Sequence, residues 1–157
     1  MKRALRNDRT SSPHVVYPFE MEDSMTFLEI INLHPDPSSL DHDSLLRCVD
    51  ECVDCAANCI ACADACLAES DLRELIRCIR LSLDCADACG ATGRIVTRET
   101  TPDLRLISAM VKACSAACLV CAEECELHAD HHEHCRVCAA VCRRCKQACD
   151  DLLVRIG

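Results

Sequence analysis

Apolar residues recur at steps of three and four along most of this chain, with polar and charged residues between them. A helix turns about 100° per residue, so such steps return a side chain to nearly the same side. Short stretches rich in proline, glycine, serine or histidine interrupt the pattern. The sequence therefore predicts four long helices, at about residues 40–68, 71–90, 102–127 and 131–155.

The ends of these segments contain residues that are typical of helix starts and helix ends. Gly90 and Gly93 are expected to end the second helix, and Thr101 followed by Pro102 is expected to begin the third. Short connections make successive long helices antiparallel neighbours. The predicted fold is all-α, an antiparallel up-down-up-down four-helix bundle.

The first forty residues differ from the rest. His34-Pro35-Asp36-Pro37 reads as a turn or linker, and the spacing of Met21, Met25 and Leu28 predicts a short helix at about residues 20–33. We therefore divide the chain into an N-terminal extension, residues 1–40, and a bundle domain, residues 41–157.

The inward positions of the bundle are filled by cysteine. The stretch from Cys48 to Cys66 reads CVDECVDCAANCIACADAC, and its six cysteines fall within an arc of roughly 80° on a helix. All 18 cysteines belong to four such runs: Cys48, Cys52, Cys55, Cys59, Cys62, Cys66; Cys78, Cys85, Cys89; Cys114, Cys118, Cys121, Cys125; Cys135, Cys138, Cys142, Cys145, Cys149.

Four cysteine stripes facing one another give the bundle a Cys-lined core. The segment after Phe27 has no aromatic residue, so large rings do not fill the interior. Aliphatic residues on or beside the stripes are expected to hold the helices together: Leu46, Val53, Ile60, Leu75, Ile79, Leu83, Ile107, Val111, Val120, Val137 and Val141.

The expected compartment and the net charge of the protein narrow the range of its possible functions. The N-terminus has no apolar run of signal-peptide length and no twin-arginine pair, so we expect a cytoplasmic protein with reduced thiols. No segment approaches the ~18 uninterrupted apolar residues of a membrane span, which predicts no membrane association. The net charge of -9 argues against nucleic acid as a partner.

The cysteine stripes favour a soft metal ion over other uses of thiols. Thiolates select Cu(I), zinc and iron-sulfur clusters. Structural zinc wants four ligands in a closed tetrahedron, and iron-sulfur clusters are usually held by loops. Cu(I) accepts two or three sulfurs, which suits C-x-x-x-C pairs repeated along a helix. The sequence therefore favours several Cu(I) ions per chain, held in a row.

Other interpretations of the thiols remain open. A metallothionein-like buffer for zinc or cadmium would use the same thiolates. A redox or disulfide protein is a further alternative, since C-x-x-C spacings occur, although no strand pattern accompanies them. Catalysis is not expected, because no acid-base pair or nucleophile-base arrangement stands apart from the stripes.

The runs CVDECVDCAANCIACADAC, CSAACLVCAEEC and CRVCAAVCRRCKQAC closely resemble the bacterial copper storage proteins over about residues 41 to 155. That resemblance implies a four-helix bundle with a cysteine-lined interior that stores many Cu(I) ions. The absence of an export signal points to the cytosolic branch. The resemblance to the family also implies a homo-oligomer, commonly a tetramer, that exchanges copper with donor or acceptor proteins.

Carrying the ligand role across implies that every cysteine from Cys48 to Cys149 binds copper. The second helix departs from the pattern, since Ser82 occupies a position where a partner for Cys78 is expected.

Histidines gather at one end of the predicted bundle. Antiparallel connections place the loop after Cys66 and the loop after Cys125 at the same end. Helical phase puts His131 on the sulfur face, one turn before Cys135, and points His132 away. In the cytosolic members of the resembling family, histidines line the mouth through which copper enters. His131 and His128 are therefore predicted at the copper entrance, with His134 as a third candidate.

Overall fold

A computed structural model describes residues 26–157 of the protein, with side chains described from Leu28 onward. This part of the chain is helical throughout, apart from its connections. The helices are α1 (Thr26–Asn32), α2 (His42–Leu67), α3 (Leu72–Val96), α4 (Leu104–His128) and α5 (Glu133–Ile156). The first residues of the short helix predicted at 20–33 lie outside the described residues.

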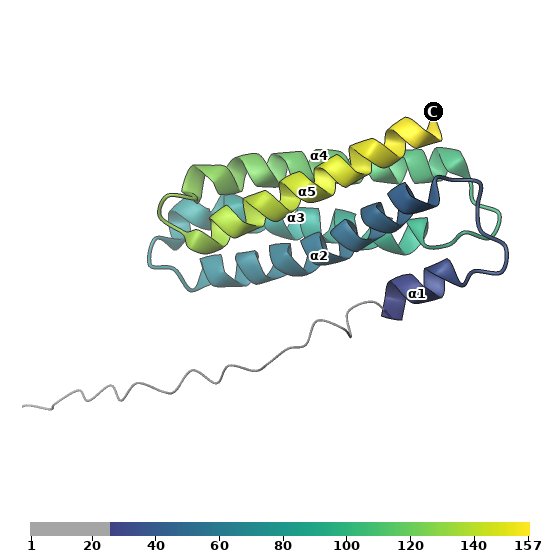
Figure 1. Cartoon of the computed structure of the whole chain (residues 1–157). Helices are drawn as coiled ribbons and strands as arrows, with labels where there is room; N and C mark the ends of the chain where they lie inside the picture. The colour runs from purple at the N-terminus through teal and green to yellow at the C-terminus, as the bar shows by residue number, and fades with distance from the viewer. Residues whose placement is uncertain (1–25) are drawn as a thin grey trace, which may run out of the picture.

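Helices α2 to α5 form an antiparallel bundle, and α1 lies beside one end of it (Figure 1). Helix α2 packs on α3 and α5, and α4 packs on the same two helices. The α2–α3 and α4–α5 connections lie at the end of the bundle far from α1. We call this end, with its connections, the mouth. The predicted fold, a four-helix bundle preceded by a short helix, is confirmed.

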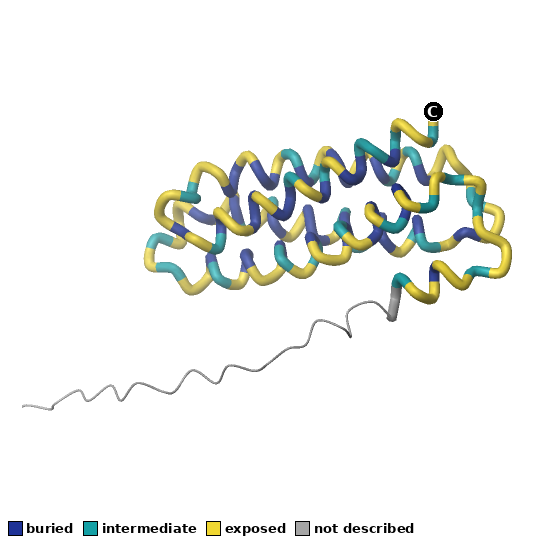
Figure 2. Tube along the Cα trace, viewed as in Figure 1, coloured by how far each residue is buried: buried dark blue, intermediate teal, exposed yellow. Residues whose placement is uncertain are grey.

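The interior of the bundle is made largely of sulfur. All eighteen cysteines are buried, and none is more than 3% exposed. Buried positions follow the inner side of each helix along its length (Figure 2). The periodic placement of cysteine therefore translates directly into a continuous core.

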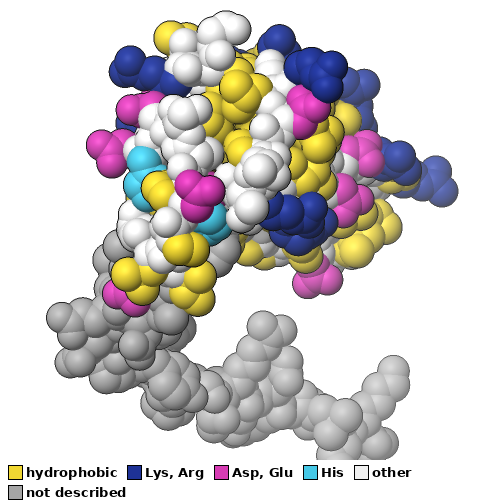
Figure 3. Space-filling model, turned by 90° about the vertical axis from the view of Figure 1, so that its right-hand side faces the viewer, with side chains coloured by type: hydrophobic (Ala, Val, Ile, Leu, Met, Phe, Trp, Pro, Cys, Tyr) yellow, Lys and Arg dark blue, Asp and Glu magenta, His cyan; other side chains and the backbone are white. Residues whose placement is uncertain are grey.

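Aliphatic side chains close the bundle at the end near α1. Leu45, Val49, Val111 and Leu152 are buried there, and Ile31 of α1 packs against the same cluster. On the outer surface of this end, hydrophobic side chains lie among acidic and basic ones (Figure 3). The sulfur core is thus sealed by ordinary hydrophobic packing at one end.

Helices α2 and α4 are capped by aspartates, and Asp103 caps α4 two residues after Thr101, where that helix was expected to begin. The Asp41 carboxylate accepts a hydrogen bond from the Ser44 backbone N–H, and Asp103 accepts from the N–H groups of Arg105 and Leu106. These contacts satisfy backbone donors of the first helical turn. In the connection before α2, Ser38 donates its backbone N–H and its hydroxyl to the buried carboxylate of Glu99.

Helix α3 continues past the two glycines predicted to end it. Gly90 and Gly93 lie inside α3, which runs to Val96. A Cβ at Gly93 would lie 3.5 Å from Cys52 Cβ. The glycine therefore permits α3 to approach α2 closely, and tertiary packing overrides the weak helix propensity of the residue.

Several aliphatic residues expected in the core are exposed. Val53, Ile60, Leu83, Val120 and Val137 are between 39% and 56% exposed. The prediction was wrong for them because cysteine fills the centre of the inward arc and leaves these neighbouring positions at its outer edges. The bundle consequently carries apolar side chains on its outer surface.

Among the described residues, only α4 is long and apolar enough to cross a membrane by length and composition. Four cysteines contribute to that character, and all four point into the bundle. Core helices of bundles pass the same test.

Thr101 stores backbone strain in the connection between α3 and α4. Its φ is 48°, in the left-handed region that disfavours β-branched residues. We expect Thr101→Gly to raise the free energy of unfolding of the metal-free protein by roughly 1 kcal/mol. Chemical denaturation measures this change. Thr97→Gly, at an ordinary φ of -69°, is the control and should destabilise; equal effects of the two substitutions would contradict the strain.

Candidate metal centre

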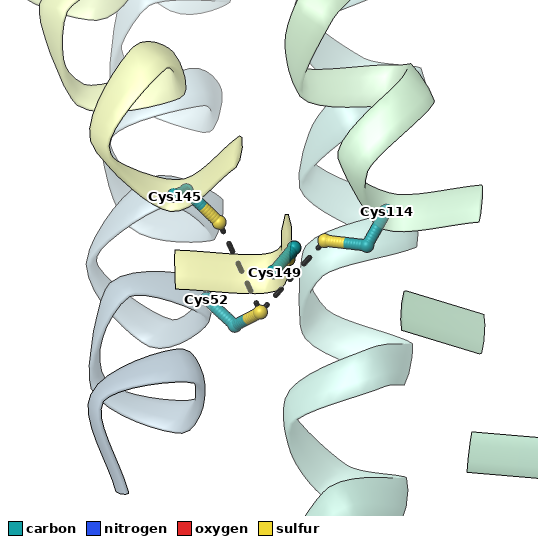
Figure 4. A group of neighbouring side chains, drawn as sticks. All are labelled: Cys52, Cys114, Cys145 and Cys149. Atoms are coloured by element: carbon teal, nitrogen blue, oxygen red, sulfur yellow. Dashed lines mark hydrogen bonds between the residues drawn. The ribbon is translucent and has the colours of Figure 1, made fainter. Parts of the chain in front are cut away.

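The sulfur atoms of facing helices lie in van der Waals contact along the bundle. The Sγ of Cys52, on α2, is 3.7 Å from that of Cys114 and 3.9 Å from that of Cys145 (Figure 4). Further along, the Sγ atoms of Cys89 and Cys118 approach to 3.4 Å. Thiols from all four helices therefore converge on one axis.

Neighbouring groups of thiols share members. The group Cys52, Cys114, Cys145, Cys149 has its sulfur atoms within 4.8 Å of one another. Cys145 belongs also to a second group, Cys55, Cys89, Cys118, Cys145, and Cys55 belongs to a third, Cys55, Cys59, Cys85, Cys142. A fourth group shares two thiols with the third: Cys59, Cys121, Cys138, Cys142. Ions in successive groups would be bridged by the shared thiolates.

Ser82 interrupts this sulfur lattice on α3. It is fully buried, and its hydroxyl oxygen lies 3.7 Å from Cys121 Sγ. A hydroxyl is a hard donor that soft metal ions do not prefer. The expected gap in the ligand pattern of the second long helix is therefore present in the core.

His134 joins the thiols at the mouth. Its Nδ1 lies 3.5 Å from Cys135 Sγ, 3.6 Å from Cys62 Sγ and 3.9 Å from Cys66 Sγ. These four ligand atoms lie within 4.8 Å of one another. The structure thus brings the third-ranked histidine, rather than the first two, onto the sulfur axis.

The carboxylates of Glu69 and Asp71 contact the imidazoles of His132 and His134. Glu69 Oε1 lies 3.2 Å from His134 Nε2 and 3.2 Å from His132 Nδ1, and Asp71 Oδ2 lies 3.3 Å from His132 Nε2. An N–H of His134 donated to Glu69 leaves the Nδ1 lone pair directed toward sulfur. Glu69 was not predicted as a site residue, although its position three residues after Cys66 places it at the same end of the bundle.

The other two predicted histidines do not face the sulfur atoms in this way. His131 was predicted on the sulfur face, and this prediction is wrong, because α5 begins at Glu133 and His131 lies exposed in the preceding turn. His128 is half-buried, with its Nε2 3.5 Å from the carboxylate of Glu124. His132 is buried and contacts the carboxylates of Glu69 and Asp71.

Burial favours the protonated form of the thiols at the mouth. Burial, and then the neighbouring charges of Cys78 and Cys62, raise the pKa of Cys66 to about 12. Burial and the charges of Cys62 and Cys78 raise the pKa of Cys135 too. For His134, burial lowers the pKa, but the hydrogen bonds with Cys62 and Glu69 outweigh it and raise the pKa overall. Thiolates this close cannot all remain ionised without cations between them.

The donor set defines a site for soft cations. All eighteen cysteines are free thiols, and they present many sulfur donors with one imidazole at the mouth. Such donors prefer Cu(I) and other soft or borderline ions over magnesium or calcium. The geometry is that of a multi-ion metal store inside a helical bundle.

Comparison with known proteins agrees with this class of protein, a multi-ion metal store inside a helical bundle. Residues 41–154 match the family model described as copper storage protein. The chain belongs to the copper storage protein family. No curated protein sequence matches the chain.

Solved structures of a Streptomyces lividans protein are similar over most of the chain. The copper storage protein Ccsp, loaded with 10 copper equivalents, is 44% identical, with a TM-score of 0.79; the match covers 81% of this chain and 97% of that one. A structure of a cytosolic copper storage protein from the same organism, with five coppers, is 48% identical, with a TM-score of 0.72, over 73% and 96% of the two chains.

These findings confirm the predicted family, its all-α bundle and copper as the stored ion. The expectation of a cytosolic protein agrees with the description of the second relative.

Proton release should accompany copper binding. Cys66 and Cys135 at the mouth have raised pKa values, with that of Cys66 at about 12, so these two thiols are protonated near neutral pH and a Cu(I)–thiolate bond to either one must displace a proton. The apparent Cu(I) affinity should therefore fall as the pH is lowered from 8 to 5, by about tenfold per pH unit for each proton released. Competition with a Cu(I) chelator at several pH values measures this slope, and a flat profile would contradict thiolate ligation.

Proposed function

We propose that the protein is a cytosolic store that sequesters Cu(I) for safety or for delivery, and that it has no catalytic role. The observation that carries this proposal is the set of sulfur groups sharing members along one axis. Ions in such a lattice can be bridged by common thiolates. One Cu(I) per thiolate also keeps the buried axis near electrical neutrality, which burial demands.

All eighteen cysteines are proposed as copper ligands, and the mouth as the copper entrance. His134 is supported in this role by its contacts with three thiols. His128 and His131 stand at the same end and stay predicted entrance residues.

A buffer for zinc or cadmium is less well supported along the axis. A divalent ion in a group of four thiolates leaves two uncompensated negative charges in the apolar interior. Each such group would carry the free-energy cost of this buried charge, and sharing thiolates between groups does not remove the cost fully. A disulfide relay has less support still, since the shortest sulfur–sulfur contact among the described residues, between Cys89 and Cys118, is 3.4 Å, beyond the ~2.05 Å of a disulfide bond.

A homo-oligomer, a tetramer by resemblance to the family, is supported by an apolar groove between α2 and α3. The groove has a volume of about 400 Å³ and is lined by Val53 and Ile60, with Gly90 and Gly93 among the residues of α3. A second copy of the chain is its proposed occupant.

Sedimentation analysis gives the mass of the assembly, and a monomer at all concentrations would contradict the proposed homo-oligomer. Donor or acceptor proteins would exchange copper at the mouth.

The chain is proposed to divide at about residue 40, into an N-terminal extension and the bundle. The family model begins at residue 41. Within the described part of the extension, α1 contributes Ile31 to the core cluster, so it acts as a cover for the end opposite the mouth.

The copper capacity tests the proposal. Anaerobic titration with Cu(I) against a chromophoric chelator should show the reduced protein withholding on the order of one ion per thiol. Replacing Cys55 and Cys118, which each contact thiols on two other helices, with serine should lower the capacity by at least about two ions. Ser82→Cys should raise it by about one.

A matched control adds hydroxyls without removing thiols. Ala116→Ser and Ala140→Ser introduce two serines at exposed positions of α4 and α5 and should leave the capacity unchanged. A wild-type protein that withholds only one or two ions, or a capacity insensitive to the cysteine substitutions, would contradict copper storage along the axis.

A further inference from the structure

The mouth differs chemically from the rest of the sulfur axis. The described groups deeper in the bundle contain four cysteines, whereas the group at the mouth contains Cys62, Cys66, Cys135 and one imidazole, that of His134. Three thiolates and one histidine are a common ligand set for a tetrahedral zinc ion.

The distances at the mouth match such a tetrahedron. Zn–S bonds of about 2.3 Å and Zn–N bonds of about 2.0–2.1 Å place sulfur and nitrogen about 3.5 Å apart, and two sulfurs about 3.8 Å apart. The observed separations from His134 Nδ1 are 3.5 Å to Cys135 Sγ, 3.6 Å to Cys62 Sγ and 3.9 Å to Cys66 Sγ, and the Sγ atoms of Cys66 and Cys135 are 3.9 Å apart. Small side-chain shifts suffice to close the site around one ion.

We propose that Cys62, Cys66, Cys135 and His134 form a site for one divalent ion of the zinc class, held at the mouth when the protein lacks copper. This site goes beyond copper storage, and the storage function does not depend on it. The divalent ion replaces the three thiol protons, which pass to solvent, and Cu(I) entering the mouth displaces it.

Charge confines the divalent ion to the mouth. Three thiolates with Zn²⁺ and a neutral imidazole leave one negative charge, against two for a group of four thiolates. The mouth is also the least enclosed part of the sulfur axis: Cys62 is 3% exposed, and it lines a groove of about 390 Å³ with His134 and Glu133. A hydrated ion reaches these ligands without crossing the core.

The carboxylate of Glu69 contacts the second ring nitrogen of His134, Nε2. Glu69 Oε1 lies 3.2 Å from His134 Nε2, which is the contact that orients a metal-bound imidazole in many zinc sites. The same oxygen lies 3.2 Å from His132 Nδ1. Glu69 is therefore a positioning residue for the site, since it holds His134 in the orientation that turns Nδ1 toward the thiols.

Zinc competition tests the site directly. The reduced, copper-free full chain is titrated anaerobically with Zn²⁺ against a chromophoric zinc chelator, and with Co²⁺ as a visible-absorbing substitute. We expect one strongly held ion per chain and a Co²⁺ spectrum of tetrahedral thiolate type. His134→Ala should weaken zinc binding at least tenfold and alter the Co²⁺ spectrum. Glu69→Gln should weaken it about tenfold.

Two controls leave the mouth intact. His34→Ala removes a histidine near the opposite end, and Asp84→Asn removes an exposed carboxylate of α3 that pairs with Arg80. Neither should change zinc binding. Failure to bind zinc, several equivalent zinc ions per chain, or no effect of His134→Ala on affinity and spectrum would each overturn the proposal.

Cu(I) titration of the same preparations separates the two claims. A copper capacity near one ion per thiol, together with absent zinc binding, would refute the divalent site and leave copper storage standing. Zinc held by His134 with a copper capacity of only one or two ions would refute storage and leave the site standing.

Discussion

The structure depends on close packing of sulfur atoms inside a regular helical bundle. Steps of three and four residues bring every cysteine to the inner face, and opposing helices then place sulfur against sulfur at 3.4 to 4.0 Å. Thiols pack as small apolar groups when they are protonated. The same contacts become ligand sets once protons are replaced by cations. One arrangement therefore serves both as the core of the metal-free fold and as the container of the filled one.

Charge balance explains why the two ends of the axis differ. Among residues 28–157, no lysine or arginine is buried to offset ionised thiols, so monovalent ions paired one to one with thiolates are the cations that the interior accommodates best. At the end near α1, aliphatic residues such as Leu45 and Leu152 exclude water. At the mouth, polar groups including Glu69 and His134 surround the last thiols. This difference supports the proposal that copper is exchanged with the solvent at the mouth.

The sequence predicted the bundle and the inward cysteines because a single period, repeated in four segments, decides both. It failed where the outcome depended on contacts between helices. Gly93 lies inside α3, since a close approach to Cys52 outweighs its propensity. His131 was placed by extending a helix backward, but α5 begins two residues later and His134 takes the inward position instead. Glu69 could be found only once the two connections at the mouth were seen together.

Because neighbouring groups share thiols, the copper ions are expected to occupy a contiguous sulfur lattice rather than separate sites. X-ray absorption spectroscopy of the copper-loaded protein distinguishes the two arrangements. We expect Cu(I) with two or three sulfur neighbours and a clear copper–copper contribution that grows as the protein fills, because adjacent groups share Cys145, Cys55 and Cys59. A first shell dominated by nitrogen or oxygen, or sulfur-bound copper without copper neighbours at full loading, would contradict it.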